Sequence, residues 1–312
     1  MQKISLAIHG GAGTILKEEL TPELEKAYLQ GLEEALEAGY AVLEKGGSAT
    51  EAVKAAVVIL EDNILFNAGR GAVFTKEGTH EMDAAIMEGK NLSAGAVAGV
   101  KNIKNPIQLA EAVMCKSDHV LLSGKGASDF AQQQGFILQP DEYFFSAFRH
   151  NQWLQMKDGD AYALDHSSAE IKEKKFGTVG AVACDANGNI AAATSTGGMT
   201  NKNYGRIGDT PLIGIGTYAN NKTCAISCTG HGEPFIKAVA AYDVSCLMEY
   251  MELGLAEAMN EVVNNKLPKI EGEGGMIGVD AMGNLSLQFN SAGMYRGAKS
   301  NDGTSFVCIY KD

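Results

Sequence analysis

The chain has 312 residues, of which 45% are hydrophobic, and a formal net charge of −12. Phosphate binding requires a basic face, so this acidic balance argues against a nucleic-acid partner. No stretch reaches the roughly 18–20 apolar residues that a membrane-spanning helix needs, and the apolar run at the start is too short for a signal peptide. Six cysteines spread through apolar surroundings are typical of reduced thiols, so we expect a soluble, cytoplasmic protein.

The first part of the chain is expected to form a strand, a glycine turn and two helices. Residues 6–8 are a short apolar strand, and the glycines within residues 9–13 favour a tight turn. Thr21, followed by proline, is typical of a helix start. Residues 48–51 form a capping box, which predicts the start of a second helix.

The remaining elements fall on either side of a polar segment. Before this segment we expect strands at residues 67–73, 82–86, 94–100 and 120–122 and a helix at 106–114. After it we expect strands at 178–184, 190–194, 212–217, 223–228, 275–280, 285–289 and 306–310. The second half should also contain a hairpin turn at 185–189 and helices at 235–251 and 255–264. The segment itself, residues 157–176, lacks apolar periodicity and predicts a mobile surface linker. This order favours one α/β domain with helices on both faces of stacked sheets.

Gly177 and Thr178 lie where this linker meets an apolar strand. Glycine tolerates a strained backbone that exposes its carbonyl to the neighbouring hydroxyl. Attack by the Thr178 hydroxyl would convert the peptide bond into an ester, and water would release Thr178 as a new N-terminus. Its free α-amino group, with a pKa of roughly 7.7–8, can serve as general base for its own hydroxyl. An ordinary strand entry is the more common meaning of these residues alone.

Three further segments place polar residues beside glycines. Residues 193–201 carry four hydroxyls around a glycine turn, although such hydroxyls often bond only the backbone. Arg206 and Asp209 suggest a clamp for the carboxylate and ammonium of a free amino acid; the alternative is a surface ion pair. Thr229 and the amide of Gly230 follow an apolar strand and can donate to a developing oxyanion.

Cys224, Cys228 and His231 raise the alternatives of a zinc site and a cysteine nucleophile. Their spacing is not C-x₂-C and no second ligand pair follows, so both alternatives are weak. The chain contains no G-x-S-x-G elbow and no phosphate-binding glycine loop in a strand-to-helix setting. We therefore expect catalysis without a cofactor.

Taken together, these segments resemble the plant-type L-asparaginase and isoaspartyl aminopeptidase family of N-terminal-nucleophile hydrolases. The motifs are HGGAG at residues 9–13, FNAG at 66–69, GTVGAV at 177–182, TSTGG at 194–198, GRIGD at 205–209 and TGHGE at 229–233. They cover nearly the whole chain. Several motifs in one order are far more specific than any single one.

The resemblance implies a four-layer αββα sandwich that matures into two subunits. The α-subunit would comprise residues 1–177, including the mobile linker at about 157–177, and the β-subunit residues 178–312. Two such pairs would form a dimer of αβ heterodimers. The implied substrates are L-asparagine, cleaved to aspartate and ammonia, and β-aspartyl (isoaspartyl) dipeptides, with the preference between them left open.

The resemblance also implies a role for each matching residue. Thr178 would be the nucleophile, Thr196 would hydrogen-bond to it, and Asn67 would orient the site. Thr229 and Gly230 would form the oxyanion hole and contact the substrate. Arg206 and Asp209 would anchor the substrate. A structural sodium ion is implied on backbone carbonyls of Leu60, Glu61, Asn63, Phe66, Ala68 and Arg70. Oxygen ligands of this kind suit a hard cation.

Two alternatives remain within the same architecture. A glycosylasparaginase-like hydrolase shares it, but that family tends to carry an acidic residue before its threonine, where this chain has Gly177. A non-catalytic homologue would keep the Arg206 and Asp209 clamp and bind amino acids without ever being cleaved. Cleavage between Gly177 and Thr178 distinguishes the enzyme from this second alternative.

Overall fold

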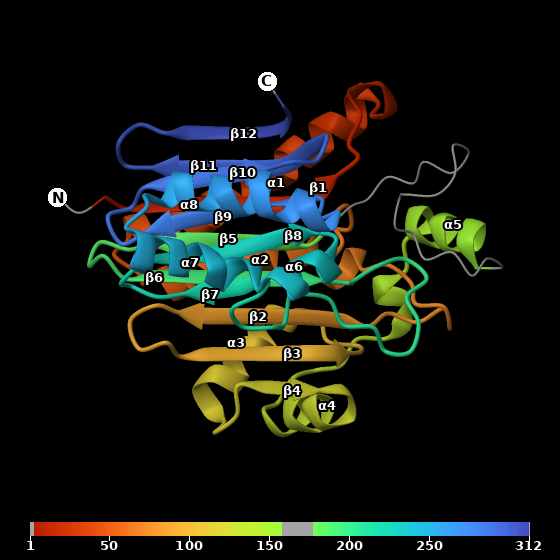
Figure 1. Cartoon of the computed structure of the whole chain (residues 1–312). Helices are drawn as coiled ribbons and strands as arrows, with labels where there is room; N and C mark the ends of the chain where they lie inside the picture. Colours follow the sequence, from red (N-terminus) through yellow and green to blue (C-terminus); the bar gives the residue numbers. More distant parts are fainter. Residues whose placement is uncertain (1–2, 158–176, 312) are drawn as a thin grey trace.

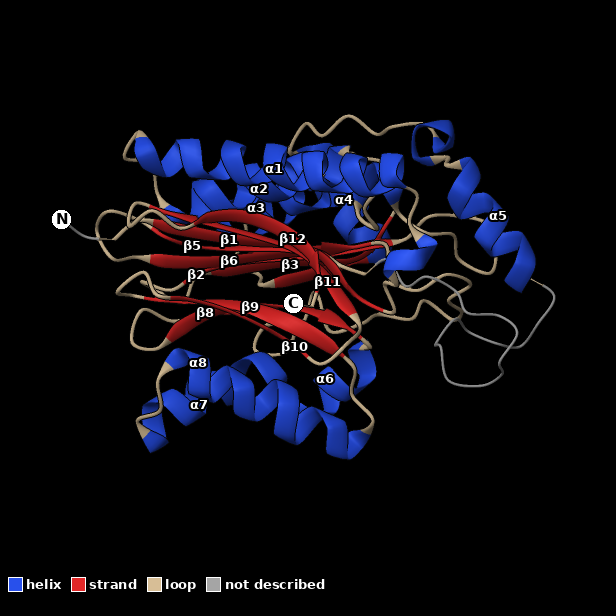
Figure 2. Ribbon diagram, turned by 90° about the horizontal axis from the view of Figure 1, so that it is seen from above, coloured by secondary structure: helices blue, strands red, loops and turns tan. Residues whose placement is uncertain are grey.

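The computed structural model describes residues 3–157 and 177–311. Figure 2 shows four layers in the order helices, sheet, sheet, helices. This arrangement confirms the αββα sandwich predicted from the sequence. The predicted linker at 157–176 lies outside the described residues, except for Lys157.

Three helices cover the outer face of the larger sheet: α1 (Pro22–Glu44), α2 (Ala49–Asp62) and α3 (Pro106–Lys116) (Figure 2). Their starts follow the sequence signals. The Thr21 hydroxyl accepts a hydrogen bond from the Leu24 amide, and Ser48 forms the predicted capping box with Glu51. The predictions of these helix starts are therefore confirmed.

The larger sheet has eight strands in the order β12-β11-β1-β5-β6-β2-β3-β4 (Figure 1). Its strands are β1 (Ser5–Gly13), β2 (Met82–Glu88), β3 (Ala94–Val100), β4 (Leu121–Ser123), β5 (Val179–Cys184), β6 (Ile190–Thr196), β11 (Gly293–Ser300) and β12 (Ser305–Tyr310). Strand β5, which begins directly after Thr178, pairs with β1 on one side and β6 on the other. The predicted cleavage point thus lies at the end of a central strand.

The smaller sheet has four strands in the order β10-β9-β8-β7. Its strands are β7 (Thr217–Ala219), β8 (Cys224–Gly230), β9 (Gly274–Asp280) and β10 (Leu285–Phe289). The helices α6 (Gly232–Ala238), α7 (Ala240–Met251) and α8 (Leu255–Asn260) cover its outer face (Figure 2). Two further helices, α4 (Gly124–Gln133) and α5 (Ala147–Met156), lie toward one side of the molecule.

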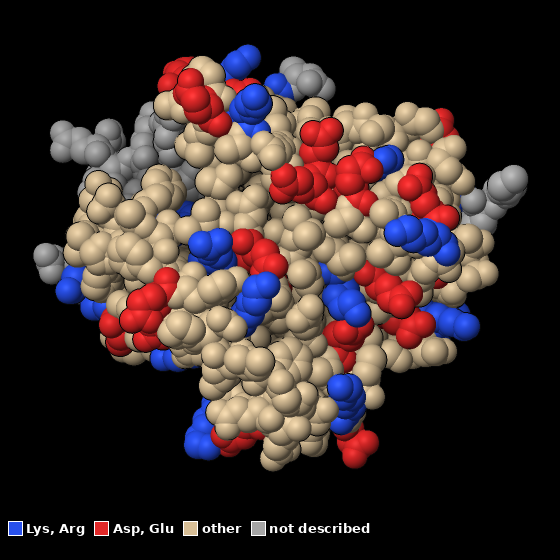
Figure 3. All heavy atoms as spheres, turned by 180° about the vertical axis from the view of Figure 1, so that it is seen from behind, with Lys and Arg blue, Asp and Glu red and all other residues tan. Residues whose placement is uncertain are grey.

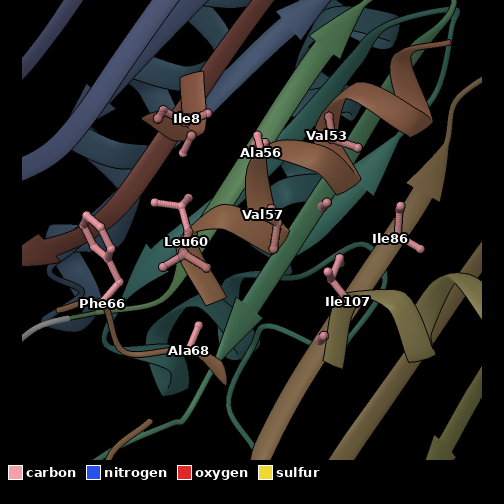
Figure 4. Packing of buried hydrophobic residues seen from close by; sticks show 14 of the residues in the cluster. Ile8, Val53, Ala56, Val57, Leu60, Phe66, Ala68, Ile86 and Ile107 are labelled. Carbon is pink, nitrogen blue, oxygen red and sulfur yellow. The ribbon is translucent and has the colours of Figure 1, made fainter. Parts of the chain in front are cut away.

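Two buried apolar clusters hold the layers together. One lies between the outer helices and the larger sheet, where Val53, Val57 and Leu60 of α2 pack near Ile8 of β1 (Figure 4). The other fills the space between the sheets and beneath α6–α8. Side chains alternate along β5 and β6, so Ala193 belongs to the first cluster while Thr194 and Thr196 face the second sheet.

Several predicted elements differ in the structure. Residues 9–13 are not a turn but the end of β1, whose register against β11 shifts between His9 and Gly11. Gly11 has φ 120°, which lets the strand continue through the irregularity. Residues 67–73 are not a strand but irregular backbone around a short 3₁₀ helix, Gly69–Gly71.

The second half needs corrections of the same kind. The predicted strand at 212–217 is mostly turn, and only its last residue belongs to β7. The predicted helix at 235–251 is two helices, because Val239 adopts a left-handed conformation with φ 50°. The predicted helix at 255–264 changes after Asn260 into a π-helix, Glu261–Lys266. The sequence did not predict α4, α5 or β11.

The described surface carries mixed charge. On the face in Figure 3, Lys and Arg side chains are interspersed with Asp and Glu, so the described residues there form no continuous basic surface of the kind that phosphates require. Within residues 3–157 and 177–311, every helix is too short or too polar to span a bilayer. All six cysteines are free thiols.

Candidate active site

Thr178 and Thr196 meet at the end of the two central strands. Thr178 is 7% exposed, and its Oγ1 donates a hydrogen bond to Thr196 Oγ1 over 3.2 Å. The register that pairs Val179 with Ser195 brings the two threonines together. The amide of Gly198 also donates to Thr196 Oγ1, over 3.0 Å. The Thr178 hydroxyl is therefore fixed in direction, with its proton pointing at Thr196.

The peptide before Thr178 is packed against a third hydroxyl. A Cβ on Gly177 would lie 2.7 Å from Thr229 Oγ1, and a Cβ on Gly11 would lie 2.6 Å from the Gly177 nitrogen. Real Cβ atoms do not come that close, so both positions require glycine. Thr229 thus lies directly beside the predicted point of cleavage.

Thr229 is fully buried, and its Oγ1 accepts a hydrogen bond from the Ala12 amide over 3.2 Å. Within the described residues its own hydroxyl proton enters no hydrogen bond, so it can donate to a negative oxygen that forms nearby. Gly230 has φ 142°, and a Cβ there would overlap the Glu273 carbonyl. The end of β8 therefore has a backbone that only glycine tolerates.

Asn67 acts on the turn that follows Thr196. Its Nδ2 donates to the Gly198 carbonyl over 2.7 Å, and its Oδ1 accepts from the Val73 amide over 3.1 Å. The Gly197 amide donates to the Asn67 carbonyl over 3.0 Å. Asn67 therefore fixes the turn whose Gly198 amide holds Thr196.

The predicted anchors Arg206 and Asp209 flank the start of α6. A Cβ on Gly232 would lie 2.9 Å from both Arg206 Nη2 and Asp209 Oδ1. Arg206 is engaged: its Nε and Nη2 donate to the two carboxylate oxygens of Glu233 over 3.0 and 2.8 Å. A substrate carboxylate that binds Arg206 must therefore share or displace Glu233.

The pKa values of Asp209 and Glu233 are shifted in opposite directions. Burial raises the pKa of Asp209 to about 6, against the opposing effects of backbone hydrogen bonding and the Arg206 charge. Partial burial also acts to raise the pKa of Glu233, but hydrogen bonds from His231 and Arg206 outweigh it and hold that pKa well below its usual range. Within the described part of the chain, Asp209 Oδ2 has no hydrogen-bond partner. A buried, unsatisfied carboxylate oxygen is what an incoming ammonium would satisfy.

The sequence had not assigned Glu233 or Lys202. Lys202 is 2% exposed; its Nζ donates to the Glu81 carbonyl over 2.7 Å and lies close to Gly198. Its side chain therefore packs beside the Gly198 turn. No spacing rule pairs Arg206 with a glutamate 27 residues later, so only the fold shows that contact.

The segment predicted to hold sodium begins in the last turn of α2, which contains Leu60 and Glu61, and continues as a series of turns. A Cβ on Gly69 would lie 2.5 Å from the Glu61 carbonyl, and one on Gly71 would overlap the Phe66 carbonyl. Backbone oxygens therefore crowd these two glycines. In the described ranges, no group of three or more His, Cys, Asp or Glu side chains could hold a metal. Cys224 and Cys228 are fully buried thiols, which gives no support to the zinc alternative.

Comparison of the sequence with known proteins places this chain in a family. The sequence profile of the family described as "Asparaginase" matches residues 1–309. The chain belongs to the asparaginase family.

Several members of the asparaginase family are similar to this chain over nearly its whole length. The isoaspartyl peptidase of Salmonella typhimurium is 51% identical over 100% of both chains, and that of Escherichia coli is 50% identical over 100% of this chain and 98% of its own. The plant-type L-asparaginase of Pyrococcus abyssi is 44% identical over 93% of this chain and 94% of its own. The family resemblance expected from the motifs is confirmed.

Proposed function

We propose that this protein is a hydrolase that cleaves itself before Thr178 and then hydrolyses L-asparagine and β-aspartyl dipeptides. The observation that carries the proposal is the arrangement around the Gly177 peptide, with the Thr178 hydroxyl on one side of it and the Thr229 hydroxyl against it. The names of the similar enzymes, isoaspartyl peptidase and L-asparaginase, support this substrate class.

Self-cleavage uses the groups around Gly177. The Thr178 oxygen attacks the Gly177 carbonyl carbon, and its proton leaves toward Thr196, which already accepts it in a hydrogen bond. The oxygen that becomes negative is stabilised by the Thr229 hydroxyl. The C–N bond then breaks as the proton passes from Thr196 to the departing nitrogen, which gives an ester. Water hydrolyses that ester to leave a carboxylate on Gly177 and a free amine on Thr178.

Turnover repeats this chemistry on a bound substrate. The Thr178 amine takes the proton of its own hydroxyl, and the oxygen attacks the side-chain carbonyl of the aspartyl group. Thr229 and Gly230 stabilise the oxyanion, and ammonia or an amino acid departs with the proton. Water then hydrolyses the aspartyl ester. Asparagine and aspartyl dipeptides share this path because the anchors bind only the aspartyl part.

One pair of assays compares the activity of the protein on the two predicted substrate classes. Purified protein is assayed for ammonia release from asparagine and for leucine release from β-aspartyl-leucine. Activity on either substrate supports the proposal. A cleaved protein that is inactive on both, yet hydrolyses the amide bond between sugar and side chain in a glycosylated asparagine, would support the glycosylasparaginase-like alternative instead.

Asp209 gives a pH dependence to substrate binding. Only its ionised form attracts the substrate ammonium, and with a pKa of about 6 it loses that charge as the pH falls through 6. We expect KM for asparagine to rise below pH 6, by about tenfold per pH unit for a single proton. Steady-state kinetics between pH 5 and 8 measure this. In Asp209→Asn, KM should be high and independent of pH; a wild-type KM that is flat down to pH 5 would contradict the role of Asp209.

The subunit organisation forms part of the proposal. Cleavage would give an α-subunit of residues 1–177 and a β-subunit of residues 178–312. The two would stay together, since β1 of the first is hydrogen-bonded to β5 and β11 of the second. The association of two such pairs into a dimer of αβ heterodimers is proposed from the family resemblance and is measured by light scattering.

A sodium ion bound by backbone carbonyls between Leu60 and Arg70 is a further part of the proposal. The crowding of the Glu61 and Phe66 carbonyls around glycines supports it, because neutral oxygens suit a hard cation of low charge. A ligand that binds only the folded state raises stability, so we expect Tm to be about 2–5 °C higher in sodium chloride than in choline chloride of equal ionic strength. Equal Tm values in the two salts would refute a sodium site.

A further inference from the structure

A row of buried polar side chains crosses the space between the two sheets behind Thr178. His9 on β1 and Thr194 on β6 belong to the larger sheet, and Thr217 on β7 and Ser227 on β8 belong to the smaller one, which lies directly beneath it (Figure 2). All four side chains are 0% exposed. Buried polar groups are costly unless they are hydrogen-bonded, so their partners indicate what the row does.

The His9 ring has a defined protonation state. Burial lowers the pKa of His9 to about 3, so the imidazole is neutral and carries a single N–H. Nδ1 lies 3.0 Å from the Thr178 carbonyl oxygen, which can only accept. Nδ1 therefore carries the proton, and Nε2 accepts from the Ser227 hydroxyl at 2.9 Å.

The shortest contacts among the remaining hydroxyls then fix one order. Ser227 donates to His9, so it accepts from Thr194 Oγ1 at 2.7 Å. Thr194 in turn accepts from Thr217 Oγ1, also at 2.7 Å. The longer contacts, from Thr194 to the Gly216 carbonyl at 3.4 Å and from Thr217 to the Thr210 carbonyl at 3.1 Å, are left without a proton in this order. The donors thus run in one direction from β7 to the imidazole, and the imidazole donates to Thr178. The row thus supplies the donor that His9 Nε2 accepts in this tautomer.

The Thr178 carbonyl depends on this imidazole because the strand ladder ends before it. The pairing of β1 with β5 stops at His9 opposite Gly180, and β1 becomes irregular immediately afterwards. A Cβ on Gly180 would overlap both His9 Nε2 and Ser227 Oγ, so glycine at 180 keeps the space that the ring and the hydroxyl occupy. A side chain thus replaces a missing backbone donor.

We propose that His9 is a positioning residue that holds the nucleophile in place after cleavage, an inference that rests on the proposed function. Before cleavage Thr178 is fixed by the chain on both sides. After cleavage its nitrogen is free, and the residue is held by its carbonyl, its hydroxyl and the chain that follows. The bond from His9 to the carbonyl then keeps the amine and the hydroxyl aimed at the substrate.

Two substitutions separate positioning from mere packing. The amide nitrogen of Asn reaches the place of Nδ1, so His9→Asn keeps the donor to Thr178; Gln reaches the place of Nε2, so His9→Gln loses it. We expect kcat per cleaved chain to fall about 10- to 100-fold in His9→Gln and to be largely retained in His9→Asn, with KM unchanged in both. The cleaved fraction is measured by mass spectrometry.

A matched control comes from a hydroxyl pair remote from the row. Ser245 is 0% exposed and pairs with Thr223 Oγ1 over 2.7 Å, so Ser245→Ala removes the same kind of bond as Ser227→Ala. Both variants should lower Tm. Only Ser227→Ala should lower kcat, because only that variant removes the hydrogen bond that holds the His9 ring through Nε2. If His9→Gln does not fold, the comparison of Ser227→Ala with Ser245→Ala tests the positioning role of His9 instead.

The outcomes separate this inference from the function it rests on. Wild-type protein that neither cleaves itself nor turns over either substrate would overturn the proposed function. Active wild-type protein with equal kcat in His9→Gln and His9→Asn would overturn the positioning role alone. A lower kcat in His9→Gln than in His9→Asn at equal cleaved fractions supports it.

Discussion

Thr178→Ala is expected to remain one uncleaved chain and to lose asparagine turnover by about four orders of magnitude or more. The substitution removes the only hydroxyl that points at Thr196 from the predicted cleavage point, so neither the ester that splits the chain nor the aspartyl ester can form. Gel electrophoresis and ammonia release measure the two losses.

Thr178→Ser is the matched variant for this experiment. It keeps the hydroxyl and removes one methyl group, so cleavage and turnover should persist at reduced rates. A Thr178→Ala protein that is clipped at 177/178, or that still releases ammonia at the wild-type rate, would show that another residue is the nucleophile.

Thr229→Val is expected to have the second-largest effect. It keeps the shape of the side chain and removes the hydroxyl that lies against Gly177. Loss of one oxyanion donor costs about 10²–10³-fold in kcat, so we expect a fall of that order per cleaved chain. The donor serves both reactions, so self-cleavage should also slow, which a time course by mass spectrometry follows.

Thr223→Val provides the control for that loss. Thr223 is a buried threonine next to the other end of β8, and its hydroxyl pairs with Ser245. It should lower stability and leave kcat unchanged. Equal kcat values for Thr229→Val and wild-type protein would exclude Thr229 from the oxyanion hole.

The sequence predicted the architecture because its signals are local. Capping residues at Thr21 and Ser48 mark the starts of α1 and α2, and apolar runs mark β5 and β6. The strand β11 was missed because its side chains do not alternate between apolar and polar, although neighbouring strands bury it. Val239 breaks a helix within an apolar pattern that continues across it. Tertiary contacts determine both the formation of β11 and the end of α6 at Val239.

The candidate site was predictable only in part for a similar reason. The sequence motifs identified Thr178 and Arg206 as site residues, because each lies in a segment flanked by glycines. The pairing of Arg206 with Glu233 and the contact of His9 with Thr178 join residues 27 and 169 positions apart. Such contacts depend on strand order and on the stacking of two sheets. Neither leaves a local pattern in the sequence.

The most direct test is to follow cleavage and activity together in one freshly purified sample. Mass spectrometry gives the fraction of chains cut between Gly177 and Thr178, and ammonia release gives the activity at each time. The account predicts that activity rises in proportion to the cut fraction, extrapolating to zero for the uncut chain. Full activity in a sample of intact chains would contradict it, because the base on which Thr178 depends is an amine that only cleavage liberates.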